Sequence, residues 1–219
     1  TSIKPDKHYY NVFLSFLILL ISHLIAKAII RNEEMKEKIL KENHKVHNML
    51  LENLYKDGFT GLFNYTALFN LLDYDTLNDS NYNNKNLHIA VIDVDYFKKI
   101  NDTYGHEAGN VVLKEVSSRL LNIMENNSNI FVARYGGDEI CVVFHNFSKE
   151  NVYNLLENFR KSIQDKKFNE LNENNITISV GIASYNNENS SDFFKKADTA
   201  LYEAKENGRN QIKILKEQF

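Results

Sequence analysis

Two apolar runs joined by a glycine turn constrain the fold of this chain more than any other feature. Residues 130–133 and 140–144 are apolar, and between them lies Arg-Tyr-Gly-Gly-Asp-Glu, residues 134–139. Short apolar runs around a turn that contains glycine predict a tight β-hairpin, because glycine readily adopts the positive φ that such turns need. The hairpin would carry two carboxylates, Asp138 and Glu139, at its tip.

A second acidic segment follows a predicted buried strand. Residues 87–92 are mostly apolar and lead into Asp93 and Asp95, which stand two positions apart and so project from one face of an extended chain. If the two strands are neighbours, Asp93 meets Asp138 across the sheet. Like charges this close repel each other unless a cation lies between them, and carboxylate oxygens suit Mg²⁺ that carries a phosphate.

The order of the predicted elements gives the fold class. After residue 56, strands are predicted at 87–94, 130–135, 139–144, 176–183 and 211–215, and helices at 65–74, 97–103, 107–124, 149–167 and 190–207. Alternating strands and helices with antiparallel pairing at the hairpin predict an α/β (α+β) domain. The polar residues 78–86 are expected to form a loop.

Composition limits the classes of partner and the cellular compartment. The 219 residues suffice for one ordinary domain with extensions, and 43% of them are hydrophobic. A net charge of −3 gives no basic surface for a nucleic-acid polymer. Cys141 is the single cysteine, so no intrachain disulfide can form, which favours a cytosolic location for the part of the chain that contains it.

Residues 9–30 are almost wholly apolar and predict a transmembrane helix. A bilayer is spanned by about 20 residues, which this segment reaches if Lys27 extends to the interface. Lys27, Arg31, Lys36 and Lys38 place its C-terminal side in the cytoplasm. A signal peptide and a buried soluble helix are the alternatives. Because the first residue is Thr, we expect a fragment or a processed chain.

Residues 32–56 are charged and favour a helix, with neither Gly nor Pro. Apolar residues recur there at heptad-like spacing, at Met35, Ile39, Val46 and Met49. Two further positions of the same seam are polar, Glu42 and Asn53. A two-stranded coiled coil and a solvated connector helix are both consistent with this pattern.

Four motifs resemble the GGDEF family of diguanylate cyclases. RYGGDEI (134–140) resembles the family signature, with Ile140 in place of the last Phe. Segments 57–64, 92–110 and 197–210 resemble, in order, the family's N-terminal motif, its metal- and base-binding segment and its C-terminal helix. The resemblance implies a ferredoxin-like, polymerase-palm domain at 57–219 with a mainly antiparallel central sheet, preceded by a membrane region at 1–31 and a linker helix at 32–56.

The resemblance also implies roles for individual residues. The metal, Mg²⁺ or Mn²⁺, would be held by Asp93, Asp138 and the carbonyl of Val94. Catalysis would rest on Lys98, Asp138 and Glu139. Substrate contacts would come from seven positions: Phe97, Asn101, Asn110, Gly136, Gly137, Lys205 and Arg209. Arg134 is a further charge partner whose role is left open.

The activity implied is the condensation of two GTP into cyclic di-GMP and two pyrophosphates, across a homodimer at the inner face of the cell membrane.

This sequence departs from the family pattern in two places that bear on function. Asn110 replaces the family's Asp at a base contact, so a hybrid cyclic dinucleotide synthase that also accepts ATP is an alternative. Asn127 and Ile130 replace the Arg and Asp of the family's product-inhibition site. A non-catalytic nucleotide-binding or dimerisation module, or a membrane-anchored scaffold, is also consistent with the sequence.

Overall fold

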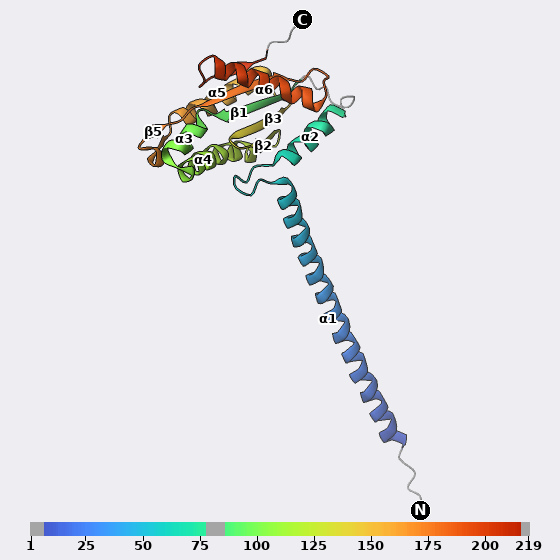
Figure 1. Cartoon of the computed structure of the whole chain (residues 1–219). Coiled ribbons are helices and arrows are strands. Elements are labelled where there is room, and N and C mark those ends of the chain that lie inside the picture. The colour runs from blue at the N-terminus through green and yellow to red at the C-terminus, as the bar shows by residue number, and fades with distance from the viewer. Residues whose placement is uncertain (1–6, 78–85, 216–219) are drawn as a thin grey trace, which may run out of the picture. The chain divides into compact units, whose positions relative to one another are not determined.

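The computed structural model describes residues 7–77 and 86–215, apart from the side chains of 7–10 and 47–49. The chain forms two compact units, residues 1–52 and 53–219, and helix α1 (Lys7–Tyr55) crosses the boundary between them. The described residues of the first unit form a single helix, and the second unit contains the sheet (Figure 1).

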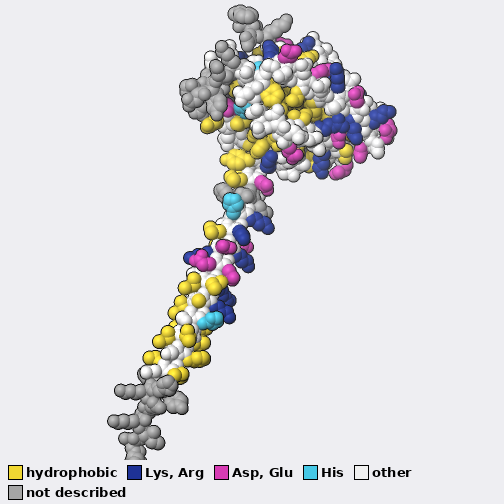
Figure 2. All heavy atoms as spheres, turned by 180° about the vertical axis from the view of Figure 1, so that it is seen from behind, with side chains coloured by type: hydrophobic (Ala, Val, Ile, Leu, Met, Phe, Trp, Pro, Cys, Tyr) yellow, Lys and Arg dark blue, Asp and Glu magenta, His cyan; other side chains and the backbone are white. Residues whose placement is uncertain are grey.

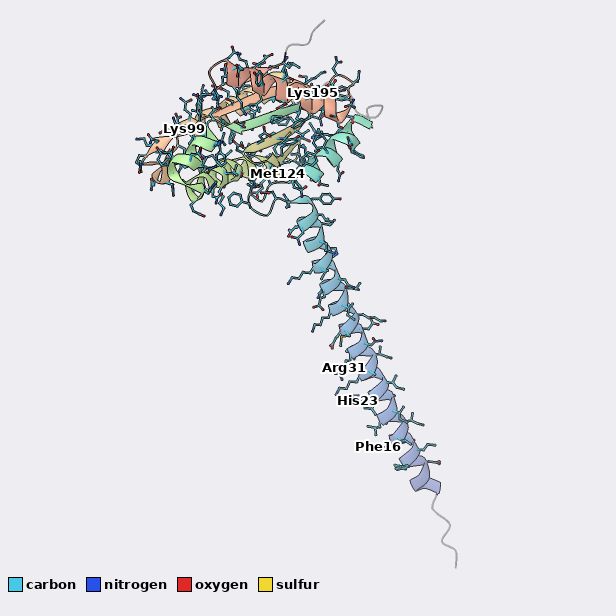
Figure 3. The ribbon with its side chains drawn as sticks, in the orientation of Figure 1. Phe16, His23, Arg31, Lys99, Met124 and Lys195 are labelled. Atoms are coloured by element: carbon cyan, nitrogen blue, oxygen red, sulfur yellow. The ribbon has the colours of Figure 1, made fainter. Side chains whose placement is uncertain are left out.

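Apolar side chains cover α1 toward its N-terminal half, and charged side chains gather along the other half (Figure 2). By length and composition, α1 is the one helix among the described residues that could cross a membrane, and none of its apolar stretch is buried. Phe16, His23 and Arg31 follow one another along α1 toward its C-terminal end (Figure 3).

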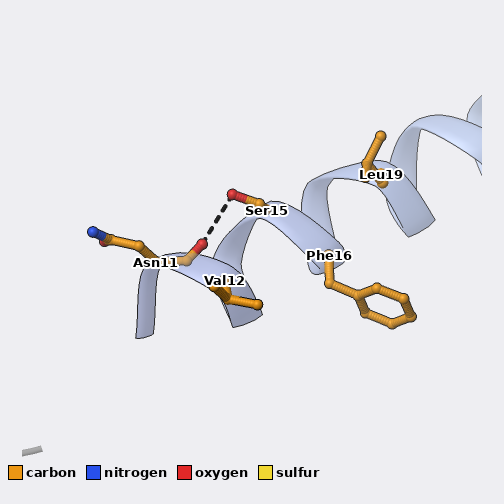
Figure 4. A pocket seen from close by; sticks show the side chains of 5 residues that line it. All are labelled: Asn11, Val12, Ser15, Phe16 and Leu19. Carbon is orange, nitrogen blue, oxygen red and sulfur yellow. Dashed lines mark hydrogen bonds between the residues drawn. The ribbon is translucent and has the colours of Figure 1, made fainter. Parts of the chain in front are cut away.

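The serines in this apolar stretch bond to the backbone of their own helix. The hydroxyl of Ser15 donates to the carbonyl of Asn11 at 2.9 Å, beside a shallow hollow lined by Val12, Phe16 and Leu19 (Figure 4). The hydroxyl of Ser22 donates to the carbonyl of Leu19 at 2.8 Å. A hydroxyl that is satisfied in this way can enter a lipid environment without an unpaired donor.

The second unit is built on a five-stranded sheet of order β2-β3-β1-β6-β7. All neighbours pair antiparallel except β6 and β7, so the α+β fold with a mainly antiparallel sheet is confirmed. The strands are β1 (Leu87–Val94), β2 (Ile130–Gly136), β3 (Glu139–His145), β6 (Ile178–Ser184) and β7 (Ile212–Ile214). The helices are α2 (Tyr65–Leu77), α3 (Phe97–Tyr104), α4 (His106–Glu125), α5 (Lys149–Gln164) and α6 (Ser190–Glu206).

The sheet separates two apolar cores, with α4 and α6 on opposite sides of it (Figure 1). Ala90 and Ile92 of β1 belong to the core under α4 and α5, whereas Ile89 and Val91 belong to the core under α2 and α6. Side chains alternate along a strand. The odd-numbered positions of β1, which include Asp93, therefore lie on the α6 face.

Helix α6 packs unusually close to the sheet at Gly181 of β6. A Cβ atom there would lie 2.1 Å from the backbone nitrogen of Leu201 and 2.2 Å from the carbonyl oxygen of Ala197. Only glycine permits this approach, which fixes the height of α6 over the sheet.

The segment between α1 and α2 runs along the outer edge of β2. Phe63 forms a parallel bridge with Ala133. Its N–H donates to the carbonyl of Val132 at 3.1 Å, and its carbonyl accepts from the N–H of Arg134 at 2.7 Å. The ring of Phe63 stacks on that of Phe131, with centroids 4.4 Å apart.

The structure differs from the sequence prediction in one region. Helix α5 ends at Gln164, and residues 165–177 form a small sheet of β4 (Lys167–Phe168) and β5 (Asn174–Asn175) around a short 3₁₀ helix, η2 (Asn169–Leu171). The carbonyl of Gln164, the last residue of this helix, accepts from the side chain of Asn175 at 2.6 Å. The loop expected at 78–86 lies, except for residue 86, outside the described residues.

Candidate active site

The turn between β2 and β3 has the conformation expected of the hairpin tip. Gly136 lies opposite Glu139, after an irregularity in the pairing of the two strands. Gly137 has a φ of 52°, a left-handed conformation that favours glycine. A Cβ atom at either glycine would have no neighbour within 4 Å, so this stretch of backbone faces open space.

Three carboxylates gather where β1 and β3 approach this turn. The residue opposite Asp93 in the sheet is Glu139, and not Asp138 as expected from the sequence, because Asp138 belongs to the turn itself. Burial raises the pKa of Asp93 to about 6, and the charges of Asp138 and Glu139 act in the same direction, against the effect of Lys205. Burial also raises the pKa of Asp138 and of Glu139. Such a group of carboxylates favours the binding of a cation.

Lys205 on α6 provides one positive charge to this cluster. Its Nζ atom lies 2.8 Å from Oδ2 of Asp93, and both side chains are largely shielded from solvent. The close packing of α6 at Gly181 holds the helix low enough for this contact. Lys205 was expected to contact a phosphate, and in this structure its partner is a predicted metal ligand.

Arg134, whose role the sequence left open, joins the hairpin tip to the segment before α2. Its Nε and Nη2 atoms donate to the carbonyl of Gly137 at 3.0 and 2.7 Å. Its Nη1 atom donates to both carboxylate oxygens of Asp57 at 3.1 and 3.2 Å. Burial acts to raise the pKa of Asp57, but hydrogen bonds from Thr60 and the charge of Arg134 outweigh it and lower that pKa. The guanidinium therefore fixes the backbone on which Asp138 stands.

The start of α3 lies beside the end of α6. Tyr96, just before α3, is left-handed with a φ of 57°, and Phe97 and the exposed Lys98 begin the helix. The guanidinium of Arg209 lies 4.6 Å from the centroid of the Tyr96 ring, a cation–π contact. Two positive side chains, Lys98 and Arg209, thus come from the neighbouring ends of two helices.

Asn101 and Asn110, the predicted base contacts, lie on α3 and α4, and both are partly exposed. The two helices meet closely at Gly109, where a Cβ atom would lie 1.9 Å from Oδ1 of Asn101. Gly109 therefore makes room for the Asn101 amide. Asn110 follows Gly109 in α4, so its backbone lies close to this contact between the two helices.

Sequence reasoning assigned no role to Asp95, which is buried. Its carboxylate accepts from the hydroxyls of Thr177 and Ser179, each at 2.6 Å, and from the N–H of Asn210 at 3.0 Å. The only sequence signal for this role was weak. It consists of two hydroxyl residues two positions apart, Thr177 and Ser179, around the start of β6, the strand that pairs with β1.

A family model described as "Diguanylate cyclase, GGDEF domain" matches residues 54–211. The chain belongs to the GGDEF domain family. The resemblance predicted from the four sequence motifs is therefore confirmed.

Known proteins similar to this GGDEF chain agree with that assignment. It is 37% identical over 180 residues to diguanylate cyclase A of Treponema denticola, covering 81% of this chain and 43% of that protein. It is 33% identical over 157 residues to an uncharacterized membrane protein of Staphylococcus aureus (strain USA300), covering 67% of this chain and 44% of that protein. The chain thus spans less than half the length of these two relatives.

The fold is similar to the crystal structure of the coiled coil and GGDEF domain of DgcB from Caulobacter crescentus in complex with c-di-GMP. The TM-score is 0.73 and the sequence identity 27%, and the match covers 86% of this chain and 98% of that one. The similarity thus extends beyond the sheet domain alone.

Proposed function

We propose that this GGDEF protein is a diguanylate cyclase that condenses two GTP molecules into cyclic di-GMP and two pyrophosphates. One observation carries the proposal: the carboxylates of Asp93, Asp138 and Glu139 gather beside Lys205 at an open glycine turn. A relative named diguanylate cyclase A supports the reaction class.

Two identical steps make the product. In each, the 3′-oxygen of one nucleotide forms a bond to the α-phosphorus of the other, and the bond from that phosphorus to the bridging oxygen breaks. Pyrophosphate leaves with the electron pair. The proton of the 3′-hydroxyl passes to a carboxylate, and Glu139 is the proposed acceptor because burial raises its pKa.

The donor set fits Mg²⁺ or Mn²⁺. In the part of the chain that the structure describes, no three acidic, histidine or cysteine side chains form a complete metal cage. Mg²⁺ does not require one, because it is usually bound by one or two carboxylates together with substrate phosphates and waters. Asp93 and Asp138 supply the carboxylates, and Val94 its carbonyl. When bound, the ion offsets the negative charge of the reacting phosphates.

The phosphates are proposed to lie against the glycine turn. Gly136, unlike Gly137, has no positive φ, and nothing packs against it. Neither backbone conformation nor packing therefore explains glycine there, whereas the close approach of a ligand does. Lys205 and Arg209 on one side and Lys98, with the backbone of Phe97, on the other provide the positive charge.

Catalysis requires a homodimer, because one site cannot close the ring and two half-sites have to face each other. Residues 32–56 form the linker helix that can set this arrangement, and residues 57–219 the catalytic domain. Residues 9–30 span the membrane. The basic residues that follow them place the catalytic domain in the cytoplasm, at the inner face of the cell membrane. The staphylococcal relative described as a membrane protein supports the anchoring.

A hybrid synthase that also accepts ATP is the second candidate, and Asn110 favours it. The base is proposed to lie against Asn101 and Asn110. An Asn side chain presents one acceptor and one donor group, a pattern that matches the edge of adenine, whereas an Asp accepts both N–H groups of guanine.

The test is to incubate the full chain in detergent micelles with GTP, ATP or both, plus Mg²⁺, and to identify the products by mass. Cyclic di-GMP with two pyrophosphates per ring is expected from GTP. Asp138→Asn, which keeps the side-chain volume, is the matched control and should make no product. Nucleotide binding without product from the wild type would instead indicate a non-catalytic receptor.

A further inference from the structure

We infer that Asp95 is a positioning residue which fastens the turn 208–210 and thereby holds Arg209 beside the start of α3. It is not a further metal ligand, although it stands two residues after Asp93 on the same face of the chain. The inference rests on the proposed function only where it takes Arg209 as a phosphate contact.

The carboxylate of Asp95 already has protein partners on both oxygens. Oδ1 accepts from the hydroxyl of Ser179 at 2.6 Å. Oδ2 accepts from the hydroxyl of Thr177 at 2.6 Å and from the N–H of Asn210 at 3.0 Å. The residue is only 4% exposed. A carboxylate offers about four acceptor positions. Three of these are filled, by Ser179 of β6, by Thr177 just before that strand and by Asn210 of the C-terminal turn.

The turn that Asp95 holds is conformationally unusual. Gly208, Arg209 and Asn210 have φ values of 107°, 63° and 46°, three left-handed residues in succession. Glycine and asparagine tolerate this region, but arginine does not favour it, so surrounding contacts have to maintain it. The N–H of Arg209 donates to the carbonyl of Ala204 at 3.0 Å, and the N–H of Asn210 donates to Asp95.

Arg160 on α5 holds the same turn from the other side. Its Nη1 atom donates to Oδ1 of Asn210 at 2.5 Å and to Oε1 of Gln164 at 2.8 Å. Glu157 fixes the guanidinium through Nε and Nη2, at 2.8 and 2.7 Å. Asn210 is thus bonded through its backbone to Asp95 and through its side chain to Arg160.

This fastening sets the position of Arg209. Lys205 lies within α6 and contacts Asp93, whereas Arg209 lies in the turn after the helix, over the ring of Tyr96. If Asn210 is released from Asp95, the left-handed turn loses a bond that maintains it, and Arg209 leaves its place beside α3. Asp95 therefore acts through Arg209 and not on the nucleotide itself.

The test compares Asp95→Ala with the wild type, as the full chain in detergent micelles. Alanine removes both acceptor oxygens, so the N–H of Asn210 loses its side-chain partner. Amide hydrogen exchange at Asn210 should become about tenfold faster. Affinity for the GTP analogue with an α,β-methylene bridge should fall about tenfold, which corresponds to the loss of one bond to a charged group. The Mg²⁺ concentration for half-maximal binding of this analogue should change less than about twofold.

Ser179→Ala is the matched control. It removes a buried bond to Asp95 but leaves the bond to Asn210, so analogue affinity should stay within about twofold of the wild type. A tenfold loss in this variant too would assign Asp95 a general structural role and overturn the inference.

A double-mutant cycle with Arg209→Ala separates positioning from direct contact. In the Arg209→Ala background, Asp95→Ala should weaken analogue binding by less than about twofold. Equal losses in both backgrounds, or a tenfold rise in the Mg²⁺ requirement, would refute the inference. Binding and exchange are measured without turnover. A wild type that binds the analogue but makes no cyclic product contradicts only the proposed function, and unchanged exchange at Asn210 contradicts only the positioning role.

Discussion

Arg134→Met tests the connection between the hairpin tip and the segment before α2. The guanidinium makes two hydrogen bonds to the Gly137 carbonyl and two to the carboxylate of Asp57. The Arg134 and Asp57 side chains are 20% and 24% exposed, so solvent screens the pair only in part. Methionine keeps the length of the aliphatic chain and removes all four bonds.

The expected loss can be estimated from these contacts. A hydrogen bond to a charged group contributes about 1.5–3 kcal/mol, and a fully exposed ion pair about 0–1 kcal/mol. For a pair exposed to this extent, we expect a coupling of about 1–2 kcal/mol between Arg134 and Asp57, and about 1 kcal/mol from the Gly137 carbonyl. Arg134→Met should therefore lower the free energy of unfolding by about 2–3 kcal/mol, or the Tm by roughly 4–12 °C for a unit of this size.

The assay is urea unfolding of the full chain in detergent, followed by far-UV circular dichroism, because the chain has no tryptophan. Asp57→Asn and the double variant complete the cycle, and Arg134→Lys keeps the charge but not the forked geometry. The lysine variant should lie between the wild type and Arg134→Met. If the two single effects add to within about 0.3 kcal/mol in the double variant, the coupling is absent and the reasoning is refuted.

Four further predictions follow from the site and the fold. Asp138→Asn should lower kcat about 100-fold or more with an unchanged circular dichroism spectrum, because it removes the charge of a proposed metal ligand. Unchanged turnover contradicts the assignment. With equal GTP and ATP, Asn110→Asp should raise the guanine preference about 10- to 100-fold, and identical product ratios from both proteins would exclude relaxed base choice. Added micromolar cyclic di-GMP should not stall a progress curve through the site at Asn127; a stall relieved by changing Asn127 would contradict this. Burial, together with the charge of Lys149, lowers the pKa of His88 despite its hydrogen bond to a carbonyl. The contribution of His88 to stability should therefore be complete above the unfolded-state pKa of about 6.5, and the free energy of unfolding should fall as the pH drops below that value. Urea titrations at several pH values should show that His88→Gln reduces this dependence of stability on pH.

The fold was largely predictable because its elements carry strong local signals. The run at 87–92 is mostly apolar and that at 140–144 is wholly apolar, and the turn between β2 and β3 contains its own glycines. The small sheet of β4 and β5 was missed because two-residue strands have no periodicity, and the bond from Asn175 to Gln164 at the end of α5 is tertiary.

The candidate site was predictable in its membership but less so in its arrangement. The acidic residues and the cations Lys205 and Arg209 were named from motifs. The register that puts Glu139 opposite Asp93 belongs to the pairing of β1 with β3, and these strands are not joined by a turn from which a register could be read. The roles of Arg134 and Asp95 depend on partners more than 70 positions away, at Asp57 and Asn210. No local pattern encodes such pairings.

The bridge at Phe63 also affects how copies of this protein can meet. Unpaired backbone groups along a sheet edge invite strands of other molecules to pair with them. Phe63 occupies part of the outer edge of β2, and the opposite edge is β7, only three residues long. Copies of this protein therefore find little strand edge to share, which reduces the tendency to aggregate into a continuous intermolecular sheet.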